Sequence, residues 1–414
     1  MEIRPILSAL LRTRTAPLLG AIQVALSLAI LANALFIVHL RLQAADRPSG
    51  IADEATLGYY NRTFPDEMKH AQVLAERERE VALLRGVPGV RSVVWSNQMP
   101  MSTSGSSSSV RVNERQEQEV ATPAIYMAPP GFVQTTGLRI IEGRDNTEAD
   151  MTETDPDKQG FIDNFPRTVL ITRALSEKLF PGETSFVGKT FLFGKDDVKG
   201  ARVRIAGVLE RLQTTQAQNG AEGEYSVLLP WRMSATRVRY VVRTEPGQRD
   251  KVMLAGEQVL RKAAGQPLRL NIRSVVDDRT RRYRNERAMA SMLIAVAGLL
   301  LLVTASGIVG LASQRVTQRR KQIGVRRAMG ARRVDILRYI LVENAIITST
   351  GILVGLFLGL ALNQLLATRL GLPRLPAAYL GGGAVTLWVL GLLAVWGPAA
   401  RAASTSPAIA TRTA

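Results

Sequence analysis

The sequence predicts an α-helical membrane protein with four transmembrane helices and a large α+β, two-lobed extracytoplasmic domain inserted between helices 1 and 2. Three observations predict this class. The chain of 414 residues contains four long apolar segments, a mixed polar stretch of residues 41–287 separates the first from the second, and basic residues gather beside the apolar segments. A chain of this length is sufficient for two or three domains.

The four apolar segments have the length and composition of membrane-spanning helices. Crossing a hydrocarbon core of about 30 Å takes roughly 20 helical residues. The first segment carries Gln23 and Asn33 in its interior and no clean cleavage site follows it, so we expect a retained anchor and not a signal peptide. The fourth is the shortest, and in an alternative interpretation it begins near Ala377. The expected spans are residues 16–40, 288–312, 336–366 and 384–400.

Basic residues flanking the spans predict the orientation in the membrane. The stretch between spans two and three, residues 313–338, holds nine basic residues against one acid, Asp335. Since Lys and Arg concentrate in cytoplasmic segments, we place this stretch, the N-terminus and the tail in the cytoplasm and residues 41–287 outside. The external domain has 37 basic and 32 acidic residues, so most of the net charge of +18 is a topology signal. A basic cluster held between two membrane helices also argues against nucleic acid as a partner.

The residue types that build metal and catalytic sites are scarce or scattered. The chain has no cysteine and two histidines, which excludes thiolate sites and argues against a histidine-based zinc site. Acidic residues such as Asp277 and Asp278, or Glu142 and Asp145, lie on apparent turns, where solvated surface or helix capping is the simplest interpretation. We therefore expect no catalytic, cofactor or metal site in this chain.

One stretch, PGETSFVGKT at residues 181–190, has the glycines and the Gly-Lys-Thr of a phosphate-binding loop. A Walker A loop needs four residues between its first glycine and its Gly-Lys pair, whereas Gly182 and Gly188 enclose five. The stretch also follows a helix-like run and leads into a strand-like one, the reverse of the order that such a loop requires. We expect a Pro-Gly turn that stops a helix at Phe180.

The external stretch alternates short strands and helices, as is typical of an α+β domain. One helix is expected within residues 64–90 and another over 248–265, and strand-like runs include TVLITR and VRYVVRT. We expect two lobes, a membrane-proximal one and a lobe inserted into it. The expected divisions are 1–40 (N-terminus and helix 1), 41–122 with 214–287 (proximal lobe), 123–213 (inserted lobe) and 288–414 (helices 2–4 and tail).

Several motifs resemble one family, the MacB/FtsX-type ABC transporter permeases. The run QRRKQIGVRRAMGARRVDILRYILVENAIITSTGILVGLFLG is similar to the family's basic segment followed by Asp-Ile-Leu and a glycine-punctuated membrane helix. The external runs FVQTTGLRIIEGRDNTEAD and VLITRALSEKLFPGETSFVGKTF, and the tail GPAARAASTSPAIATR, resemble three more family stretches. Two departures stand out: Gln322 replaces a usual Glu, and the glycine-rich pattern around the first span is missing.

The resemblance implies a multi-pass permease of the bacterial inner membrane, with a periplasmic, porter-like proximal lobe and without a fused nucleotide-binding domain. ATP and Mg²⁺ would then bind a separate cytoplasmic ABC ATPase subunit, and this chain would need no cofactor. A second permease copy, identical or related, is the other implied partner besides the lipid membrane. A periplasmic adaptor and an outer-membrane duct are further partners of the exporter type.

The basic segment, residues 313–335, shows two apolar faces at helical spacing. Val316 and Ile323 share one face, and Val325 shares another with Ala328 and Met329. A bend is expected at Gly324 and a helix end at Gly330. Composition alone favours positive-inside anchoring, whereas the resemblance implies a coupling helix that docks on the ATPase. The residues carried over to coupling are Arg319, Arg320, Lys321, Ile323, Gly324, Arg326, Arg327, Ala328 and Gly330.

Span three holds two further candidate features. Gly351, Gly355 and Gly359 fall four apart on one face, a spacing that lets two helix backbones approach closely. They serve either a dimer seam or packing inside one subunit. Glu343 is an intramembrane carboxylate, with Arg338 as the nearest cation along the chain. We favour an end-of-helix residue that snorkels or pairs locally over a role in gating.

The resemblance implies mechanotransmission: ATP hydrolysis by the partner would move the periplasmic domain and export or extract an amphiphilic substrate such as a peptide, a macrolide or a lipoprotein. An FtsX-like regulator that activates a periplasmic cell-wall hydrolase without moving a solute is the alternative. The length of the external domain, about 245 residues, favours the exporter type. A membrane-anchored enzyme is a third interpretation, which the missing catalytic cluster disfavours.

Overall fold

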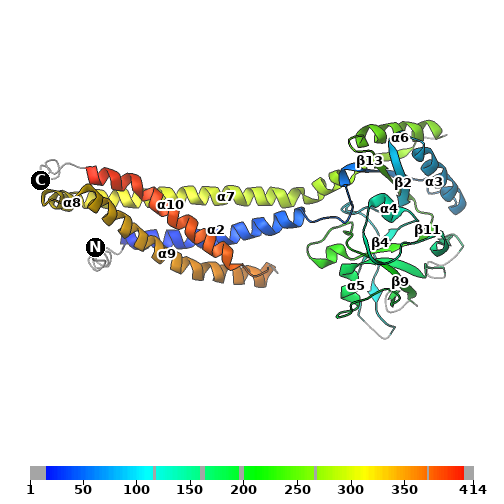
Figure 1. The fold of residues 1–414 in the computed structure, drawn as a ribbon, viewed down its shortest axis with the longest axis horizontal. Helices are drawn as coiled ribbons and strands as arrows, with labels where there is room; N and C mark the ends of the chain where they lie inside the picture. The colour runs from blue at the N-terminus through cyan, green and yellow to red at the C-terminus, as the bar shows by residue number, and fades with distance from the viewer. Residues whose placement is uncertain are drawn as a thin grey trace. The chain divides into compact units, whose positions relative to one another are not determined.

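The computed structural model describes residues 15–114, 118–158, 164–194, 200–264, 268–370 and 373–404. These residues divide into two compact units (Figure 1). The helical unit contains the chain before Ala45 and after Arg284, and the α+β unit is Ala45–Arg284. The boundaries lie within four residues of the predicted limits of the external domain, 41 and 287.

Four helices in the described part of the chain are long and apolar enough to cross a membrane. They are α2 (Thr15–Ala45), α7 (Val275–Gln318), α9 (Arg333–Leu370) and α10 (Ala377–Ser404). Each contains one of the four predicted spans, and the last begins at Ala377, as the alternative interpretation proposed. Helix α7 is 44 residues long and starts 13 residues before its predicted span, because its first turns belong to the α+β unit.

Polar side chains inside α2 are bonded to the other helices of this unit. The amide of Gln23 donates to the Val303 carbonyl at 3.2 Å, and that of Asn33 donates to the Gly359 carbonyl at 3.1 Å. Ser27 and Thr304 share a hydrogen bond of 2.7 Å. Hydrogen bonds of this kind satisfy polar groups that lipid leaves without a partner. They explain how a membrane helix accommodates the two amides noted in its sequence.

The first sheet of the α+β unit has four antiparallel strands in the order β13-β1-β12-β2. Helices α3 (His70–Arg85) and α6 (Arg249–Ala263) belong to this part of the unit. At Gly58 in β1 an added Cβ would lie 2.7 Å from the sulfur of Met253 in α6, so the close approach of helix and sheet requires glycine. The strands are β1 (Leu57–Thr63), β2 (Val90–Ser96), β12 (Arg237–Thr244) and β13 (Arg269–Ser274).

The second sheet has seven strands in the order β3-β8-β9-β7-β10-β4, with β5 also paired to β9. Its strands are β3 (Val110–Arg111), β4 (Ala124–Met127), β5 (Ile140–Gly143), β7 (Thr168–Thr172), β8 (Thr190–Phe193), β9 (Ala201–Leu209) and β10 (Ser226–Leu229). Strands β6 (Thr152–Thr154) and β11 (Trp231–Met233) form a separate pair. Short helices are η1 (Glu54–Thr56), α4 (Phe132–Thr136), η2 (Glu148–Asp150), α5 (Arg173–Leu179) and η3 (Ala221–Glu224).

The predicted lobe boundaries at 122/123 and 213/214 differ from the sheet boundaries. Strands β3 and β10 lie outside residues 123–213 but belong to the seven-stranded sheet. All four residues of β10 are buried, which requires a neighbour on each side, and β7 and β4 supply them. One hydrophobic cluster also joins the sheets, since it contains Tyr60 of β1 as well as Phe191 of β8. The two lobes therefore share a core.

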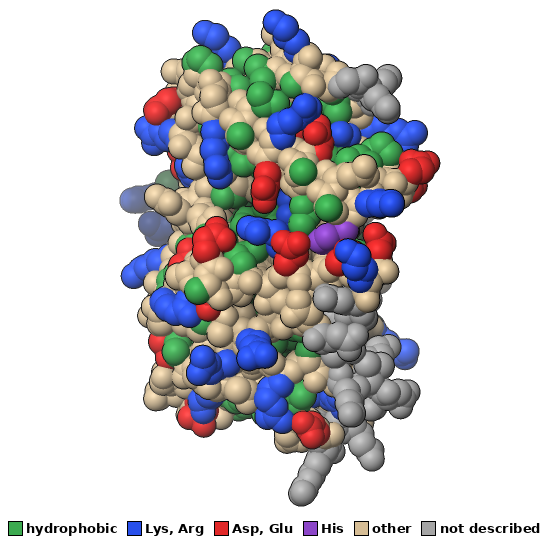
Figure 2. Space-filling view, turned by 90° about the vertical axis from the view of Figure 1, so that its right-hand side faces the viewer, with side chains coloured by type: hydrophobic (Ala, Val, Ile, Leu, Met, Phe, Trp, Pro, Cys, Tyr) green, Lys and Arg blue, Asp and Glu red, His purple; other side chains and the backbone are tan. Residues whose placement is uncertain are grey.

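The surface of the α+β unit mixes charges of both signs. Figure 2 shows Lys and Arg side chains interspersed with Asp and Glu, and hydrophobic side chains scattered in small groups between them. This agrees with the nearly balanced count of charges in residues 41–287. The charged side chains on this face are most simply explained as solvated surface residues.

Candidate coupling site

The basic segment after α7 folds as a short separate helix. Helix α7 ends at Gln318 and α8 (Arg320–Ala328) follows directly, with Arg319 between them at φ −98° and ψ 11°. Gly330 has φ +99°, a conformation that glycine adopts without strain. Its amide donates to the Arg327 carbonyl and that of Ala331 to the Arg326 carbonyl, each at 3.1 Å. These two bonds form a Schellman motif, so the helix ends where the sequence predicts.

The predicted bend at Gly324 is wrong, because the break lies at Arg319, five residues earlier. Gly324 is buried within α8, and the amide of Ile323 still donates to the Arg319 carbonyl at 3.0 Å. A glycine costs a helix about 1 kcal/mol without ending it. At the break, the guanidinium of Arg319 contacts Glu343 and Tyr339 of α9, which holds the backbone in its turned conformation.

Helix α8 has an exposed face and an inner face. Lys321, Val325 and Ala328 are exposed at i, i+4 and i+7, and Met329 follows them at the helix end. Val325 is 50% exposed and Met329 75% exposed. Ile323 lies on the other side and lines a cavity together with Val316, so the structure separates the two apolar sets as the spacing predicts.

The arginines of the segment have different surroundings. Arg319 donates to Glu343 at 3.1 Å and Arg327 donates to the Ala403 carbonyl of α10. The Arg326 guanidinium lies 5.0 Å from the centre of the Tyr339 ring, within cation–π range. Arg320 is exposed, as is Lys321. The segment thus contacts α9 and α10 with part of its positive charge and presents the rest outward.

Glu343 does not pair locally with Arg338. It is 5% exposed and its Oε2 accepts from Arg319, 24 residues earlier, across the break between α7 and α8. A residue five positions back lies about 140° around a helix, so Arg338 points along a different face. The carboxylate therefore joins α9 to the start of α8. A role in gating stays the alternative hypothesis.

The glycines of α9 pack against α2 of the same chain. A Cβ added at Gly351 would lie 2.7 Å from the Ala21 carbonyl, and one at Gly355 would lie 2.9 Å from the Ala25 carbonyl. At Gly359 the contacts are with Leu380 and with Ala29. Of the two alternatives left open by the sequence, these contacts are those of packing inside one subunit.

The loop that resembles a phosphate-binding motif already holds an anion of the protein itself. The amides of Phe186 and Val187 donate to the Glu142 carboxylate at 3.0–3.1 Å, and the Ser185 hydroxyl donates at 2.6 Å. Burial raises the pKa of Glu142, but these hydrogen bonds outweigh it and the pKa is lowered overall. Gly188 then turns the chain at φ +86° into β8, and α5 ends at Leu179 beside Phe180, as predicted.

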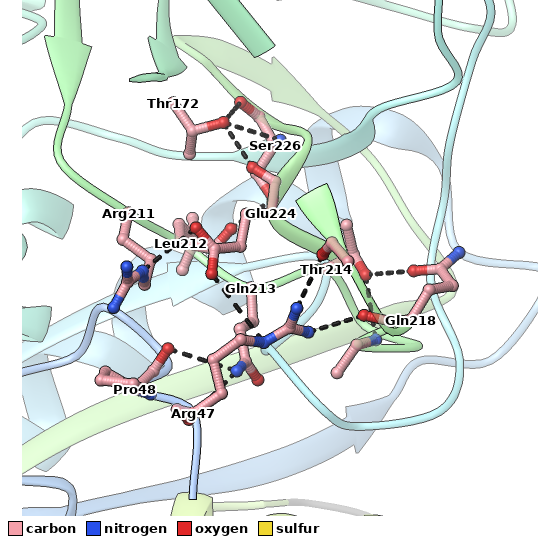
Figure 3. Close-up of polar contacts among 12 residues, drawn as sticks. Arg47, Pro48, Thr172, Arg211, Leu212, Gln213, Thr214, Gln218, Glu224 and Ser226 are labelled. Carbon is pink, nitrogen blue, oxygen red and sulfur yellow. Dashed lines mark hydrogen bonds and ion pairs between the residues drawn. The ribbon is translucent and has the colours of Figure 1, made fainter. Parts of the chain in front are cut away.

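A second polar cluster, missed by the sequence analysis, lies where the chain enters and leaves the α+β unit. We call Arg47, Glu54, Gln213 and Arg279 the entry–exit anchor. Arg279, in the first turns of α7, donates twice to Glu54, at 2.5 and 2.8 Å, and once to the Arg47 carbonyl at 2.8 Å. The Gln213 amide donates to the carbonyls of Arg47 and Pro48 at 3.2 Å (Figure 3).

The anchor extends into the loop between β9 and β10. The guanidinium of Arg47 donates to the carbonyls of Gly220 and Gln218, each at 2.7 Å, and lies 3.8 Å from Glu224 (Figure 3). Nearby, Asp278 is 2% exposed, accepts from the Tyr59 hydroxyl and pairs with Arg273, so the solvated-surface interpretation is wrong for this residue. The alternative of helix capping holds for Asp277, which exchanges hydrogen bonds with Ser274 at the start of α7. The anchor depends on pairs more than 160 residues apart, which no local sequence pattern reveals.

Two family models match the chain. The MacB-like periplasmic core domain matches residues 24–274, and the FtsX-like permease C-terminal matches residues 294–407. The first match ends where α7 begins. The second contains α8, α9 and α10 and most of the membrane part of α7.

Individual relatives are similar over different lengths. The uncharacterized ABC transporter permease YknZ of Bacillus subtilis (strain 168) is 24% identical over 343 residues, 81% of this chain and 78% of YknZ. YvrN, an uncharacterized ABC transporter permease of the same strain, is 24% identical over 269 residues, 61% of each chain. The macrolide export ATP-binding/permease protein MacB of Bradyrhizobium diazoefficiens is 36% identical over 128 residues, which are 30% of this chain and 19% of that protein.

Proposed function

Because the chain belongs to the MacB/FtsX-type ABC transporter permeases, a multi-pass membrane family with a periplasmic-type domain, we propose that it transmits motion from a cytoplasmic ATPase to its periplasmic unit. ATP and Mg²⁺ bind the ATPase in this proposal, and the chain itself performs no chemistry. The transported load is an amphiphilic molecule such as a peptide, a macrolide or a lipoprotein, exported or extracted from the inner membrane.

The observation that carries the proposal is the outward face of α8. Val325 and Met329 present apolar side chains beside exposed Lys321 and Arg320. An apolar centre with a charged rim is the usual anatomy of a protein interface. The excess of Lys and Arg supports a cytoplasmic location of the segment, where an ATPase would bind.

The inner contacts of α8 supply a path into the membrane helices. The pair Arg319–Glu343 and the stacking of Arg326 on Tyr339 connect α8 to α9, and Arg327 connects it to α10. If a bound ATPase displaced α8, the contacts of α8 with α9 and α10 would transmit the displacement to both helices. In the α+β unit, the segment after α2 bonds to the loop between β9 and β10 through Gln213, and the start of α7 bonds to the same loop through Arg282, which donates to the Gln216 carbonyl. Motion of either segment would therefore reach β9 and β10.

A second permease copy belongs to the proposal as well. The glycine face of α9 is covered by α2 of the same chain, so the copies have to meet on another face. A periplasmic adaptor and an outer-membrane duct would complete the exporter version of the assembly.

The experiment that tests coupling is affinity purification of the full chain from its native membrane, followed by identification of the bound ATPase and an ATPase assay. The variant reverses charge at the exposed positions only, Arg320→Glu with Lys321→Glu, because Arg319 and Arg327 also hold the fold. The matched control is Arg369→Glu with Arg374→Glu, an equal change of charge on exposed residues elsewhere in the helical unit. We expect the variant to lose the ATPase by about tenfold or more and the control to keep it.

An ATPase that binds the variant as well as the control would overturn the coupling proposal and leave the segment as a topology anchor. The periplasmic proteins that co-purify distinguish export from regulation of a cell-wall hydrolase. An adaptor supports export, and a cell-wall hydrolase supports the regulatory alternative.

A further inference from the structure

A cavity of about 310 Å³ lies between α7, α8 and α9 in the helical unit. Its charged lining includes Arg315, Arg319, Arg326 and Glu343. The volume is that of a small ligand site and is far larger than a single water needs. The cavity is separate from the proposed ATPase-binding surface, because the outward face of α8 is on the opposite side, although its lining includes residues that connect α8 to α9.

Two polar atoms in the lining are buried without a hydrogen-bond partner. They are Nε of Arg315 and Oε1 of Glu343, whose other oxygen accepts from Arg319. A buried polar group left unpaired destabilises the folded protein, and more strongly when it is charged. The Arg315 Nε–H needs an acceptor and the Glu343 Oε1 needs a donor. A ligand that binds in this cavity should therefore offer both an acceptor and a donor.

The charged residues that line the cavity indicate which class of ligand it binds. The residues Arg315, Arg319 and Arg326 line the same cavity as the unpaired carboxylate oxygen of Glu343, and guanidinium groups recognise phosphate oxygens. Asp335 also lines the cavity, and its carboxylate accepts from the Arg332 amide at the start of α9. The net charge of the ionisable lining is therefore +1, which matches one phosphodiester.

The rest of the lining is mostly apolar, with side chains such as those of Val316, Ile336 and Ile340. It also contains the polar side chains of Gln322, Tyr339 and Asn344. A free phosphate would leave the apolar walls uncovered, whereas the glycerol and first acyl carbons of a lipid would cover them. We propose that this cavity binds the phosphodiester of a membrane phospholipid whose head group carries a hydrogen-bond donor. The arginines hold the phosphate, and Glu343 accepts from the head-group ammonium or hydroxyl.

Native mass spectrometry of the delipidated full chain tests the proposal. Phosphatidylethanolamine, phosphatidylglycerol and phosphatidylcholine are added separately, because the choline head group has the phosphate but no donor. We expect the first two to bind about tenfold more tightly than phosphatidylcholine, the value of one charge-assisted hydrogen bond. Equal binding of all three lipids would overturn the role given to Glu343.

Variants locate the site. Arg315→Met should weaken binding of phosphatidylglycerol by about tenfold or more, and Arg326→Met should act in the same direction. The matched control is Arg320→Met, an exposed arginine of the same segment outside the cavity, which should bind like the wild type. Arg326 is itself exposed, so its variant keeps the test decisive if Arg315→Met does not fold. Binding by both variants equal to that of the control would overturn the proposal.

Two further experiments distinguish a lipid from a soluble phosphate, and the role of the arginines from that of Glu343. Glycerol phosphate at millimolar concentration should not displace the lipid, and displacement would assign the site to soluble phosphates instead. Glu343→Gln should reduce the preference for phosphatidylethanolamine over phosphatidylcholine while phosphate binding persists. The readout is lipid binding without ATPase, so its failure is distinguishable from a failure of the coupling proposal.

Discussion

In the α+β unit, Arg279 and Arg243 each donate hydrogen bonds from both sides of the guanidinium, Arg279 to Glu54 and to backbone carbonyls, Arg243 to Thr56 and to carbonyls. In the helical unit, Arg315 keeps a buried nitrogen unpaired and Arg320 is exposed. At these positions the same residue type fixes the backbone in one unit and stays available for ligands in the other. The contrast holds residue by residue and not for whole units, since Arg77 and Arg239 of the α+β unit also keep a buried nitrogen unpaired and Arg327 of the helical unit is bonded. The difference teaches that an arginine-rich segment indicates a binding surface only where its guanidinium groups are not already satisfied.

The largest effect on stability is expected at the entry–exit anchor. Arg279→Met removes the cation that pairs with the Glu54 carboxylate and leaves the Arg47 carbonyl with the Gln213 amide as its remaining donor. This should cost about 2–4 kcal/mol of unfolding free energy. Denaturant unfolding of the full chain, followed by the fluorescence of buried Trp95 and Trp231, measures the loss. Arg139→Met is the control, because Arg139 is 75% exposed in a surface pair worth about 0–1 kcal/mol. If both variants lost the same free energy of unfolding, Arg279 would contribute no more to stability than a surface arginine.

The next effect is expected where α9 meets α2. Gly355→Ala places a Cβ about 3 Å from the backbone of Ala25, so the helices have to separate, at a cost of about 1–3 kcal/mol. Thermal unfolding in detergent measures it. Gly298→Ala is the control, since nothing lies within 4 Å of the added atom there. A variant as stable as this control would show that the glycine face tolerates side chains and is free for another helix.

A smaller, pH-dependent effect is expected at Asp150. Its pKa is held well below the usual range, first by the hydrogen bonds from Arg144 and then by those from Thr147 and Thr168. A carboxyl group with a depressed pKa in the folded state stabilises above its unfolded pKa of about 4, and the contribution is lost as the pH falls through the folded value. Asp150→Asn should therefore lower the unfolding midpoint by about 2–4 °C at pH 7 and by progressively less below pH 4.

The control for this prediction is Asp250→Asn, whose side chain is 85% exposed beside Arg249. It should change the midpoint little at either pH. A deficit of Asp150→Asn that persisted unchanged down to pH 2 would mean that the side chain acts through packing and not through its charge.

The smallest effect on stability is expected on the outward face of α8. Val325→Ser removes an exposed apolar side chain and should change the unfolding free energy by less than about 0.5 kcal/mol. If the proposed interface is correct, the same variant weakens binding of the ATPase in the purification assay. Normal stability with unchanged ATPase binding would exclude Val325 from that interface.

The sequence predicted the parts of the fold that depend on long or regular signals. The four spans were found because each is an uninterrupted run of apolar residues, and the helix end at Gly330 because only glycine adopts its backbone conformation readily. Strands β1 and β13 were missed. Strand β13, RLNIRS, lies at the edge of its sheet and is only partly buried, so its apolar residues form no strong pattern.

The candidate sites were less predictable, because they depend on contacts between distant residues. The segment 313–335 was recognised from its composition and family resemblance, but the partner of Glu343 is set by how α7, α8 and α9 pack. The same holds for the cavity, whose arginines are indistinguishable in the sequence from their exposed neighbours. Gly324 shows the opposite error, since the modest cost of glycine in a helix was overcome by packing.

Helix α2 has a consequence for biosynthesis. Its amides and hydroxyl bond to residues 277 to 326 positions later in the chain, and its apolar window is 61% buried against 17–28% in the other three helices. The ribosome completes α2 long before α7 and α9. Until those helices are inserted, Gln23 and Ser27 lie in the bilayer without their hydrogen-bond partners. We expect a chain arrested before residue 303 to expose these groups to lipid and to be degraded faster than the full chain, as pulse–chase labelling would measure. The first of the four apolar helices to be made is therefore enclosed only after α9 has been made.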